Sequence, residues 1–441
     1  MANEFMFALA PDLLLLGVIV VLMLLEMSRA DARWARVVFV VGAATGLAVL
    51  AQQLTTGYAA DVVPGELATD RFAQLGKLVL LLCTLGVAVS FAAARGYKFW
   101  LLAAASTLGG MLMLGAEGFA PLFVGIELLS LPAFALIVHG QGQGAAAEGA
   151  FKYLVLSSVA SAVLLFGVSL AYGLTGTLSI AAWAHAFEHA GLQGQAAGLM
   201  VLSGLFLKAA VFPFHAWAPD AYAAARLPVT ALMASLVKAA VILALARIVA
   251  GMPLDPAAGM VVTVLAIVSI VFGNLAALGQ TRFKRLLAYS SVAHAGYMIF
   301  ALLDGTGSRG SDLLWYAAFY GLATVLACAS FAALCPDDDD DLRGLNGKFA
   351  TQPVAATLLA VAMLSLAGLP PLPGFFAKLF VFKSVIASGH LVPAVAAFVG
   401  SFLGLAYYTG IVMRLFQPAP SQAPATELPQ AEANARQRAA V

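Results

Sequence analysis

The sequence consists of long apolar runs separated by short polar segments. Runs of about 20 apolar residues are long enough to cross a bilayer core of about 30 Å as a helix. Barrel strands are excluded, because the runs are too long and unbroken, and unpaired backbone groups are too costly in lipid. The pattern therefore predicts an all-α polytopic membrane protein with about thirteen transmembrane helices, over residues 8–28, 35–56, 72–94, 98–115, 119–138, 148–173, 196–215, 228–250, 257–278, 284–303, 312–335, 353–384 and 391–416.

Composition supports this interpretation. Hydrophobic residues make up 62% of the 441 residues and charged residues only 10%, against about 25% charged in a typical soluble domain. A net charge of +1 gives no indication of a nucleic-acid partner or an acidic substrate. Cys83, Cys328 and Cys335 are scattered without a CxxC pair, which argues against a disulfide framework or a zinc site and favours buried apolar roles.

The basic residues between the helices predict the orientation of the chain. The N-terminus lacks the basic region and cleavage site of a signal peptide, so the first apolar run is expected to remain as a helix. With the N-terminus periplasmic, only Arg71 and Arg309 lie in outer loops. The inner loops then hold Arg29, Arg33, Arg36, Arg95, Lys98, Arg226, Arg282, Lys284, Arg285, Arg343, Lys348 and Arg414. Because basic residues favour the cytoplasmic side, the C-terminus is predicted to be cytoplasmic.

Four segments outside the helices have distinct compositions. Residues 174–195 are expected to form a short interfacial helix. The glycine-rich residues 139–149 follow a membrane helix rather than a strand and lack a Gly-Lys-Ser/Thr ending, so they indicate a flexible loop and not a phosphate site. The acidic run 337–341 is expected to be a solvated cytoplasmic loop. From Pro418 the Pro-, Ala- and Gln-rich tail is expected to be disordered.

Five ionisable residues lie inside the predicted helices: Glu127, Lys152, Lys208, Lys238 and Lys378. Such groups cost about 2.5–3.5 kcal/mol each on insertion scales and by default mark ion or proton pathways. A lysine can instead extend its charge to the interface or pair structurally. That alternative is weaker for Lys208, Lys238 and Lys378, which are farther from the ends of the predicted helices.

The types of these residues suit proton transfer. Burial in general lowers the pKa of a lysine and raises that of a glutamate, and a neighbouring opposite charge reverses both effects. A Glu–Lys pair whose spacing changes can therefore act as a proton switch, since separation favours release from the lysine. Glu127 and Lys208 are the candidate pair.

Prolines interrupt two of these helices close to a lysine. Pro213 follows Lys208 by five residues, and Pro373, after Pro370 and Pro371, precedes Lys378 by five. Proline inside a helix frees backbone groups and breaks or kinks it. The two helices, the seventh and the twelfth, run in opposite directions, so the mirrored order is what an inverted repeat would give. Paired interrupted helices are a pointer to a transport site, although kinks also arise from packing alone.

Polar groups of two further kinds occur in the apolar runs. His215 lies near the first break and His294 lies in AYSSVAHAGYMIF, and either could relay protons near neutral pH or be a structural group. The serines could hold water or aid helix packing; they are Ser157, Ser158, Ser161, Ser290 and Ser291.

Three long segments together carry a family resemblance. They are GLFLKAAVFPFHAWAPDAYAAARLPVTALMASLVKAAVILALARI, GNLAALGQTRFKRLLAYSSVAHAGYMI and LSLAGLPPLPGFFAKLFVFKSVI. The chain resembles, over about residues 95–416, the subunit N family of bacterial respiratory complex I, the NADH:quinone oxidoreductase. This antiporter-like subunit corresponds to subunit 2 in mitochondria.

The resemblance implies a fold of two inverted five-helix repeats, with helices seven and twelve broken. The implied domains are three N-terminal helices over 1–95, a first repeat over 96–250, a second repeat over 251–416 and a tail over 417–441. Family members typically have a fourteenth helix where this chain has its polar tail, a departure that concerns interface contacts more than the mechanism.

The resemblance also assigns roles to the buried residues. The proton path would run through Glu127, Lys208, Lys238 and Lys378. Lys152 would be a further lysine of the sixth helix and His294 a position in the linking region, both secondary. Some family members have glutamate at the twelfth-helix position, and Lys378 fits subunit N.

The implied function is proton translocation by a multi-pass subunit in the membrane arm of complex I, in the bacterial inner membrane. The implied partners are other membrane-arm subunits and lipids. No cofactor would bind this chain, since NADH, FMN, iron–sulfur clusters and quinone would be held by other subunits. The alternatives are a subunit of a Mrp-type sodium/proton antiporter or of a membrane-bound hydrogenase, a membrane scaffold with paired lysines, and a small-molecule carrier, which no sequence feature favours.

Overall fold

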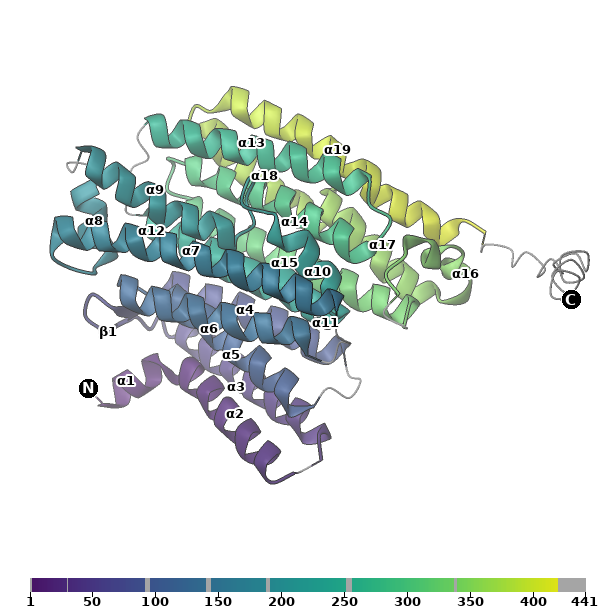
Figure 1. The fold of residues 1–441 in the computed structure, drawn as a ribbon, viewed down its shortest axis with the longest axis horizontal. Coiled ribbons are helices and arrows are strands. Elements are labelled where there is room, and N and C mark those ends of the chain that lie inside the picture. The colour runs from purple at the N-terminus through teal and green to yellow at the C-terminus, as the bar shows by residue number, and fades with distance from the viewer. Residues whose placement is uncertain are drawn as a thin grey trace, which may run out of the picture.

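The computed structural model describes residues 2–29, 31–91, 96–139, 144–187, 191–250, 256–336 and 339–418. Within this part, most helices lie side by side with their long axes roughly parallel (Figure 1). The long helices are α2 (Ala10–Met27), α3 (Arg33–Thr55), α4 (Arg71–Ser90), α5 (Tyr97–Gly115), α6 (Phe119–Val138), α7 (Ala145–Thr175), α9 (Gly191–Lys208), α13 (Pro256–Leu278), α14 (Phe283–Phe300), α15 (Arg309–Leu334) and α19 (Leu391–Phe416).

Shorter helices complete the architecture. They are α1 (Ala2–Ala8), α8 (Ile180–Phe187), α10 (Trp217–Ala224), α11 (Leu227–Leu232), α12 (Lys238–Ala250), α16 (Lys348–Thr351), α17 (Pro353–Ala367) and α18 (Pro373–Ala387), with η1 (Met233–Val237), η2 (Ala301–Leu303) and η3 (Leu342–Leu345). In the described part of the chain, eleven helical segments are long and apolar enough to cross a membrane: the long helices other than α9, and the continuous segment Leu227–Ala250 formed by α11, η1 and α12. The predicted all-α polytopic class is confirmed.

The two remaining predicted spans are the interrupted ones. Helix α9 ends at Lys208, and α10 begins at Trp217, so the predicted helix over 196–215 stops before Pro213. The predicted helix over 353–384 is two helices, α17 and α18, separated by residues 368–372. Gly368 ends α17 with φ +86°, a left-handed conformation that suits glycine. Both breaks occur next to the prolines that cannot continue a helix.

A small antiparallel hairpin, which the sequence pattern did not predict, connects α3 to α4. Its strands are β1 (Ala60–Val63) and β2 (Leu67–Thr69), and Ala60 pairs with Thr69. Leu67 also bridges to Ala116 at the end of α5. The strands, of four and three residues, are too short to stand out beside runs of 20 apolar residues, and one of their pairings is to a residue distant in the sequence.

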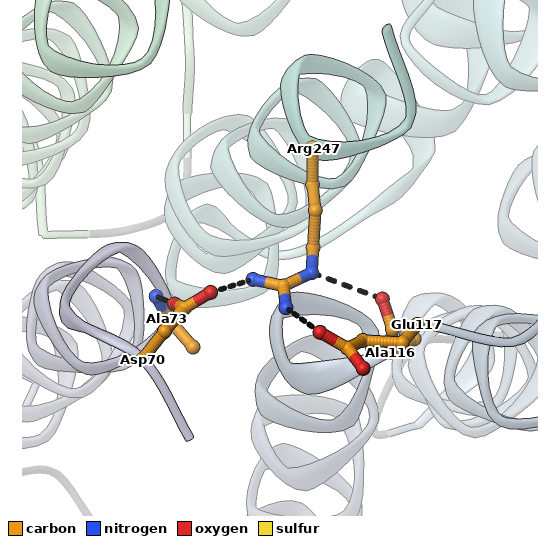
Figure 2. Close-up of polar contacts among 5 residues, drawn as sticks. All are labelled: Asp70, Ala73, Ala116, Glu117 and Arg247. Atoms are coloured by element: carbon orange, nitrogen blue, oxygen red, sulfur yellow. Dashed lines mark hydrogen bonds and ion pairs between the residues drawn. The ribbon is translucent and has the colours of Figure 1, made fainter. Parts of the chain in front are cut away.

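Arg247 ties the N-terminal helices to the rest of the molecule at the hairpin end. Figure 2 shows its guanidinium, on the last turn of α12, reaching three acceptors at the ends of other helices. Nη1 donates to Asp70 Oδ2 at 2.9 Å, Nε to the carbonyl oxygen of Ala116 at 3.0 Å, and Nη2 to Glu117 Oε1 at 3.4 Å. Asp70 also caps α4 by accepting from Ala73 N at 2.7 Å.

The predicted loop segments are partly reproduced. Helix α8 forms inside residues 174–195. The acidic run is not simply solvated, because Asp340 is buried and its Oδ1 lies 3.1 Å from Arg282 Nε. Asp340 is buried because it packs against the start of α14, where Phe283 N donates to its carbonyl oxygen. Arg95, residues 140–143, residues 188–190, residues 337–338 and the tail from 419 lie outside the described residues.

Candidate functional site

Glu127 and Lys208 meet inside the helix bundle, as the sequence predicted. Glu127 lies on α6 and Lys208 is the last residue of α9, and Lys208 Nζ is 3.5 Å from Glu127 Oε1. The lysine side chain is 4% exposed and the glutamate side chain 28%. Ser161 Oγ on α7 donates to Glu127 Oε1 at 2.5 Å, so three helices form this contact.

Two serines complete the surroundings of Lys208. Its Nζ donates to Ser157 Oγ at 2.9 Å and to Ser130 Oγ at 3.1 Å. Ser157 and Ser161 were identified from the sequence, whereas Ser130 was not. Since the lysine has hydroxyl partners as well as a carboxylate, its hydrogen bonds do not all depend on the ion pair.

Lys238 lies beyond the first helix break, with carbonyl partners instead of a carboxylate. Nζ donates to the carbonyl oxygen of Ala209 at 2.9 Å and to that of Ser291 at 2.8 Å. Ala209 directly follows Lys208 at the end of α9, so the break places an accepting carbonyl between the two lysines. The π-helix η1 immediately precedes Lys238, a local widening that occurs frequently at functional sites.

His294 lies between Lys238 and the second break. Its Nδ1 is 2.9 Å from the Tyr316 hydroxyl and its Nε2 is 3.1 Å from the Tyr408 hydroxyl. Lys238 donates to the carbonyl oxygen of Ser291 and Lys378 lies over the Tyr297 ring, and these two contacted residues are three positions before and after His294 on α14. The side chain is therefore hydrogen-bonded on both nitrogens and flanked by two lysines.

Lys378 ends this series at the second helix break. Nζ donates to the Ala367 carbonyl oxygen at 2.9 Å and to Ser401 Oγ at 3.0 Å. It also lies 4.8 Å from the centroid of the Tyr297 ring, within cation–π range. Ala367 is the last residue of α17, so here too the carbonyl belongs to the interrupted helix.

Lys152 and His215 have other surroundings. Lys152 is 43% exposed and pairs with Glu148 and Asp220, each at 2.8 Å. The His215 ring packs against Phe272 and Phe212, with centroids 4.6 and 5.3 Å apart. Neither contacts the Glu127–Lys208 pair. We call the five residues Glu127, Lys208, Lys238, His294 and Lys378 together the buried line.

Comparisons with known proteins decide the family. The family model described as NADH:quinone oxidoreductase/Mrp antiporter, TM, matches residues 116–404. The chain is 52% identical over 419 residues to the NADH-quinone oxidoreductase subunit N of Pelobacter propionicus, with 95% of this chain and 90% of that protein covered. The chain belongs to the subunit N family.

Solved structures agree with this membership of the subunit N family. A chain of respiratory complex I from Thermus thermophilus is similar with a TM-score of 0.83 and 36% identity, over 93% of this chain and 91% of that one. A chain of the Mrp complex from Dietzia sp. is similar with a TM-score of 0.85 and 26% identity, over 96% and 82%. This member of the subunit N family therefore shares its fold with antiporter-type chains.

The sequence did not single out several polar groups that this chain, a member of the subunit N family, holds in its interior. Tyr316, Tyr408 and Tyr297 contact the buried line, but aromatic residues in apolar runs are usually simple core residues. Lys77 of α4 forms a buried pair with Asp12 of α2. Both lie near the ends of predicted helices, where a charge is ordinary, so only the tertiary arrangement, in which α2 and α4 each pack against α3 and α5, could identify them.

Proposed function

We propose that this chain is a proton-translocating subunit of the membrane arm of an NADH:quinone oxidoreductase, complex I. Its family membership supports this role, since the relatives are named for that enzyme. In this role NADH oxidation and quinone reduction occur on other subunits, and this chain holds no redox centre. Its partners are the other membrane-arm subunits and the surrounding lipid of a bacterial inner membrane.

The observation that carries the proposal is the contact between Glu127 and Lys208 at the head of the buried line. A buried lysine beside a glutamate keeps its proton while the two charges are close. When the pair separates, the lysine loses this stabilisation and releases its proton more readily. Lys238 beyond the break is the next group that can accept one.

The remaining members of the buried line extend this route. His294, hydrogen-bonded to two tyrosines, lies on α14 between the residues that Lys238 and Lys378 contact and can relay a proton between the two lysines. The interrupted helices contribute the carbonyl oxygens of Ala209 and Ala367, which orient the ammonium groups without neutralising them. Lys152 serves at most a secondary role, because two carboxylates hold it near the bundle edge.

The proposal includes the arrangement predicted from the sequence. The N-terminal helices over 1–95 precede two inverted five-helix repeats, over 96–250 and 251–416, and a tail over 417–441. The N-terminus is periplasmic and the C-terminus cytoplasmic. Energy reaches the Glu127–Lys208 pair as a change of position or charge in neighbouring subunits, because this chain has no redox reaction of its own.

A second candidate is sodium/proton exchange, which the likeness to the Mrp complex chain favours. The test is sodium dependence. A complex I subunit is expected to pump protons at an unchanged rate when sodium is replaced by potassium, whereas an exchanger is expected to stop.

The function is tested with the purified complex in liposomes, comparing wild type with Lys208→Met. NADH:quinone turnover and proton uptake are recorded together, after a native gel has shown that the complex is assembled. Lys98→Met is the matched control, because Lys98 is exposed. We expect Lys208→Met to lower turnover and pumping roughly tenfold or more, as for loss of a positioned proton-transfer group, and Lys98→Met to change neither.

An assembled Lys208→Met complex that pumps at the wild-type rate would contradict the proposal. A variant that fails to assemble while Lys208→Arg assembles and pumps would indicate a scaffold charge instead, since arginine keeps its charge but does not release its proton.

A further inference from the structure

The N-terminal helices contain a second buried ion pair, which the proposed proton path does not use. Lys77 Nζ on α4 lies 2.5 Å from Asp12 Oδ2 on α2, and the two side chains are 4% and 13% exposed. The pair resembles Glu127 and Lys208 in chemistry and in burial of the lysine. A buried ion pair is weak evidence for stability, because the cost of removing both charges from water can exceed their attraction. A role other than stability is therefore reasonable.

A cavity of about 210 Å³ lies beside this pair. Leucines of α2, α5 and α6 line it together with the hairpin residues, and its polar side chains are Lys77, Asp12 and Thr69. Its volume is sufficient for water, and these three side chains supply the polar partners that a buried water needs, whereas the rest of the lining is apolar. Water at this place would be hydrogen-bonded by both charged groups.

The cavity extends along the helices from the level of Glu127 to the hairpin. Gly115, the last residue of α5, lies at the hairpin end, where a Cβ on it would be 3.1 Å from the Ala68 carbonyl oxygen, and Leu108 lies seven residues earlier, about 10 Å along the helix. Leu128, which also lines the cavity, follows Glu127 directly on α6. Leu67, Ala68 and Thr69 of the hairpin line the same end as Gly115.

We propose that Lys77 and Asp12 form a proton-exchange pair that serves the half of the membrane between Glu127 and the hairpin. A proton moves from Lys77 Nζ to Asp12 Oδ2, breaking an N–H bond and forming an O–H bond, so that a neutral amine and a neutral carboxylic acid result. Asp12 then gives its proton to water at the hairpin end. Lys77 takes another proton from water in the cavity, which restores the ion pair and moves one proton from the cavity to the hairpin end.

This inference rests on the proposed function, because a pair that exchanges protons matters only in a chain that moves them. Its competitor is a purely structural ion pair. The two differ when both charges are removed together. Removing one charge leaves the other buried and unpaired, which is strongly destabilising, whereas removing both is often neutral.

The test is the double variant Lys77→Met/Asp12→Asn in the assembled complex, with turnover and proton uptake measured in liposomes. We expect the double variant to assemble and to lose roughly tenfold or more in pumping, as for loss of a positioned proton-transfer group. Arg33→Met/Asp31→Asn is the matched control, since it removes an exposed ion pair. Wild-type pumping in the assembled Lys77→Met/Asp12→Asn complex overturns the proposal.

A cavity-filling variant keeps the proposal testable if the double variant fails to assemble. Leu13 of α2 lines the cavity, whereas Leu24 of the same helix is exposed on the outer face of the bundle. We expect Leu13→Trp to slow pumping by excluding water while the ion pair is intact, and Leu24→Trp to have no effect. Normal pumping by Leu13→Trp overturns the proposal.

Lys208→Met is measured in parallel to separate the two proposals. If Lys208→Met stops pumping and the variants of Lys77, Asp12 and Leu13 pump normally, only the exchange pair is wrong. If Lys208→Met pumps normally, the proposed function itself fails.

Discussion

The three lysines of the buried line differ in what holds their charge. Lys208 has a carboxylate partner, whereas Lys238 and Lys378 donate to carbonyl and hydroxyl oxygens. A carbonyl oxygen accepts a hydrogen bond from either an ammonium or a neutral amine, so it tolerates the loss of a proton. A carboxylate favours the ammonium form strongly. The pair with Glu127 is therefore the point at which proton release can be controlled.

Removal of the Glu127 charge tests this control. Glu127→Gln keeps the size of the side chain and its ability to accept from Ser161, but removes the attraction on Lys208. We expect proton pumping to fall roughly tenfold or more, with assembly retained. Ser161→Ala is the graded comparison, since it removes one hydrogen bond to a charged group, worth about 1.5–3 kcal/mol. Equal pumping by Glu127→Gln and wild type in liposomes would contradict this role.

Substitution of Lys238 can show whether pumping needs its positive charge or its ability to release a proton. Lys238→Arg keeps a positive charge beside the carbonyl oxygens of Ala209 and Ser291, but arginine is always protonated in proteins. If Lys238 carries protons, Lys238→Arg should be as defective in pumping as Lys238→Met. Restoration of pumping by arginine alone would show that only the charge is needed. Lys98→Arg, at an exposed position, is the control for the lysine-to-arginine substitution.

For single residues, the sequence indicated which charged side chains matter but not which neutral side chains contact them. Ionisable residues are so costly in lipid that Glu127 and Lys208 stood out without a structure. Tyr408 did not, because its contact with His294 joins residues 114 positions apart. Nothing in the local sequence distinguishes such a tyrosine from an aromatic residue of the core.

Among the helices, close packing at glycines fixes the positions of the functional groups. A Cβ on Gly109 of α5 would lie 2.4 Å from the backbone nitrogen of Leu129 on α6, two residues from Glu127. A Cβ on Gly273 of α13 would lie 2.5 Å from the nitrogen of Ala293 on α14, next to His294. Small residues allow such close approach of membrane helices, so these glycines determine where Glu127 and His294 lie.

A side chain at either glycine should separate the helices. We expect Gly109→Leu to reduce the amount of assembled complex on a native gel and to lower pumping, because α6 must move away from α5. Gly17→Leu is the control, since no heavy atom lies within 4 Å of a Cβ at Gly17 of α2. Normal assembly and pumping by Gly109→Leu would show that the close contact is not required.

The helices and their breaks could be predicted because both have local causes. Apolar length marks a span, and proline next to a lysine marks an interruption. The hairpin between α3 and α4 could not, because one of its pairings, Leu67 with Ala116, depends on tertiary contact. The burial of Asp340 was missed for the same reason, since this residue packs against the start of α14.

In the molecule as a whole, Arg247 connects the N-terminal helices to the helix that carries Lys238 (Figure 2). Its fork of donors reaches acceptors on two segments, a geometry that lysine cannot reproduce. We expect both Arg247→Lys and Arg247→Ala to lower stability by about 1–3 kcal/mol, the cost of leaving such groups unsatisfied. The thermal unfolding midpoint of the detergent-solubilised complex measures this, with the exposed Arg33→Ala as control. An unchanged midpoint in both variants would contradict the role of Arg247 as a tie.

Across the whole molecule, protons are expected to move through protonatable side chains in the interior, and exposed basic residues on the same helices are expected to take no part. Helix α18 offers a direct test, because Lys378 is buried at the end of the buried line while Lys383 on the same helix is exposed. The measurement is proton uptake per NADH oxidised by assembled complexes in liposomes, for Lys378→Met and Lys383→Met. The account predicts that Lys378→Met loses most proton uptake and that Lys383→Met keeps it. Wild-type uptake by Lys378→Met would contradict it.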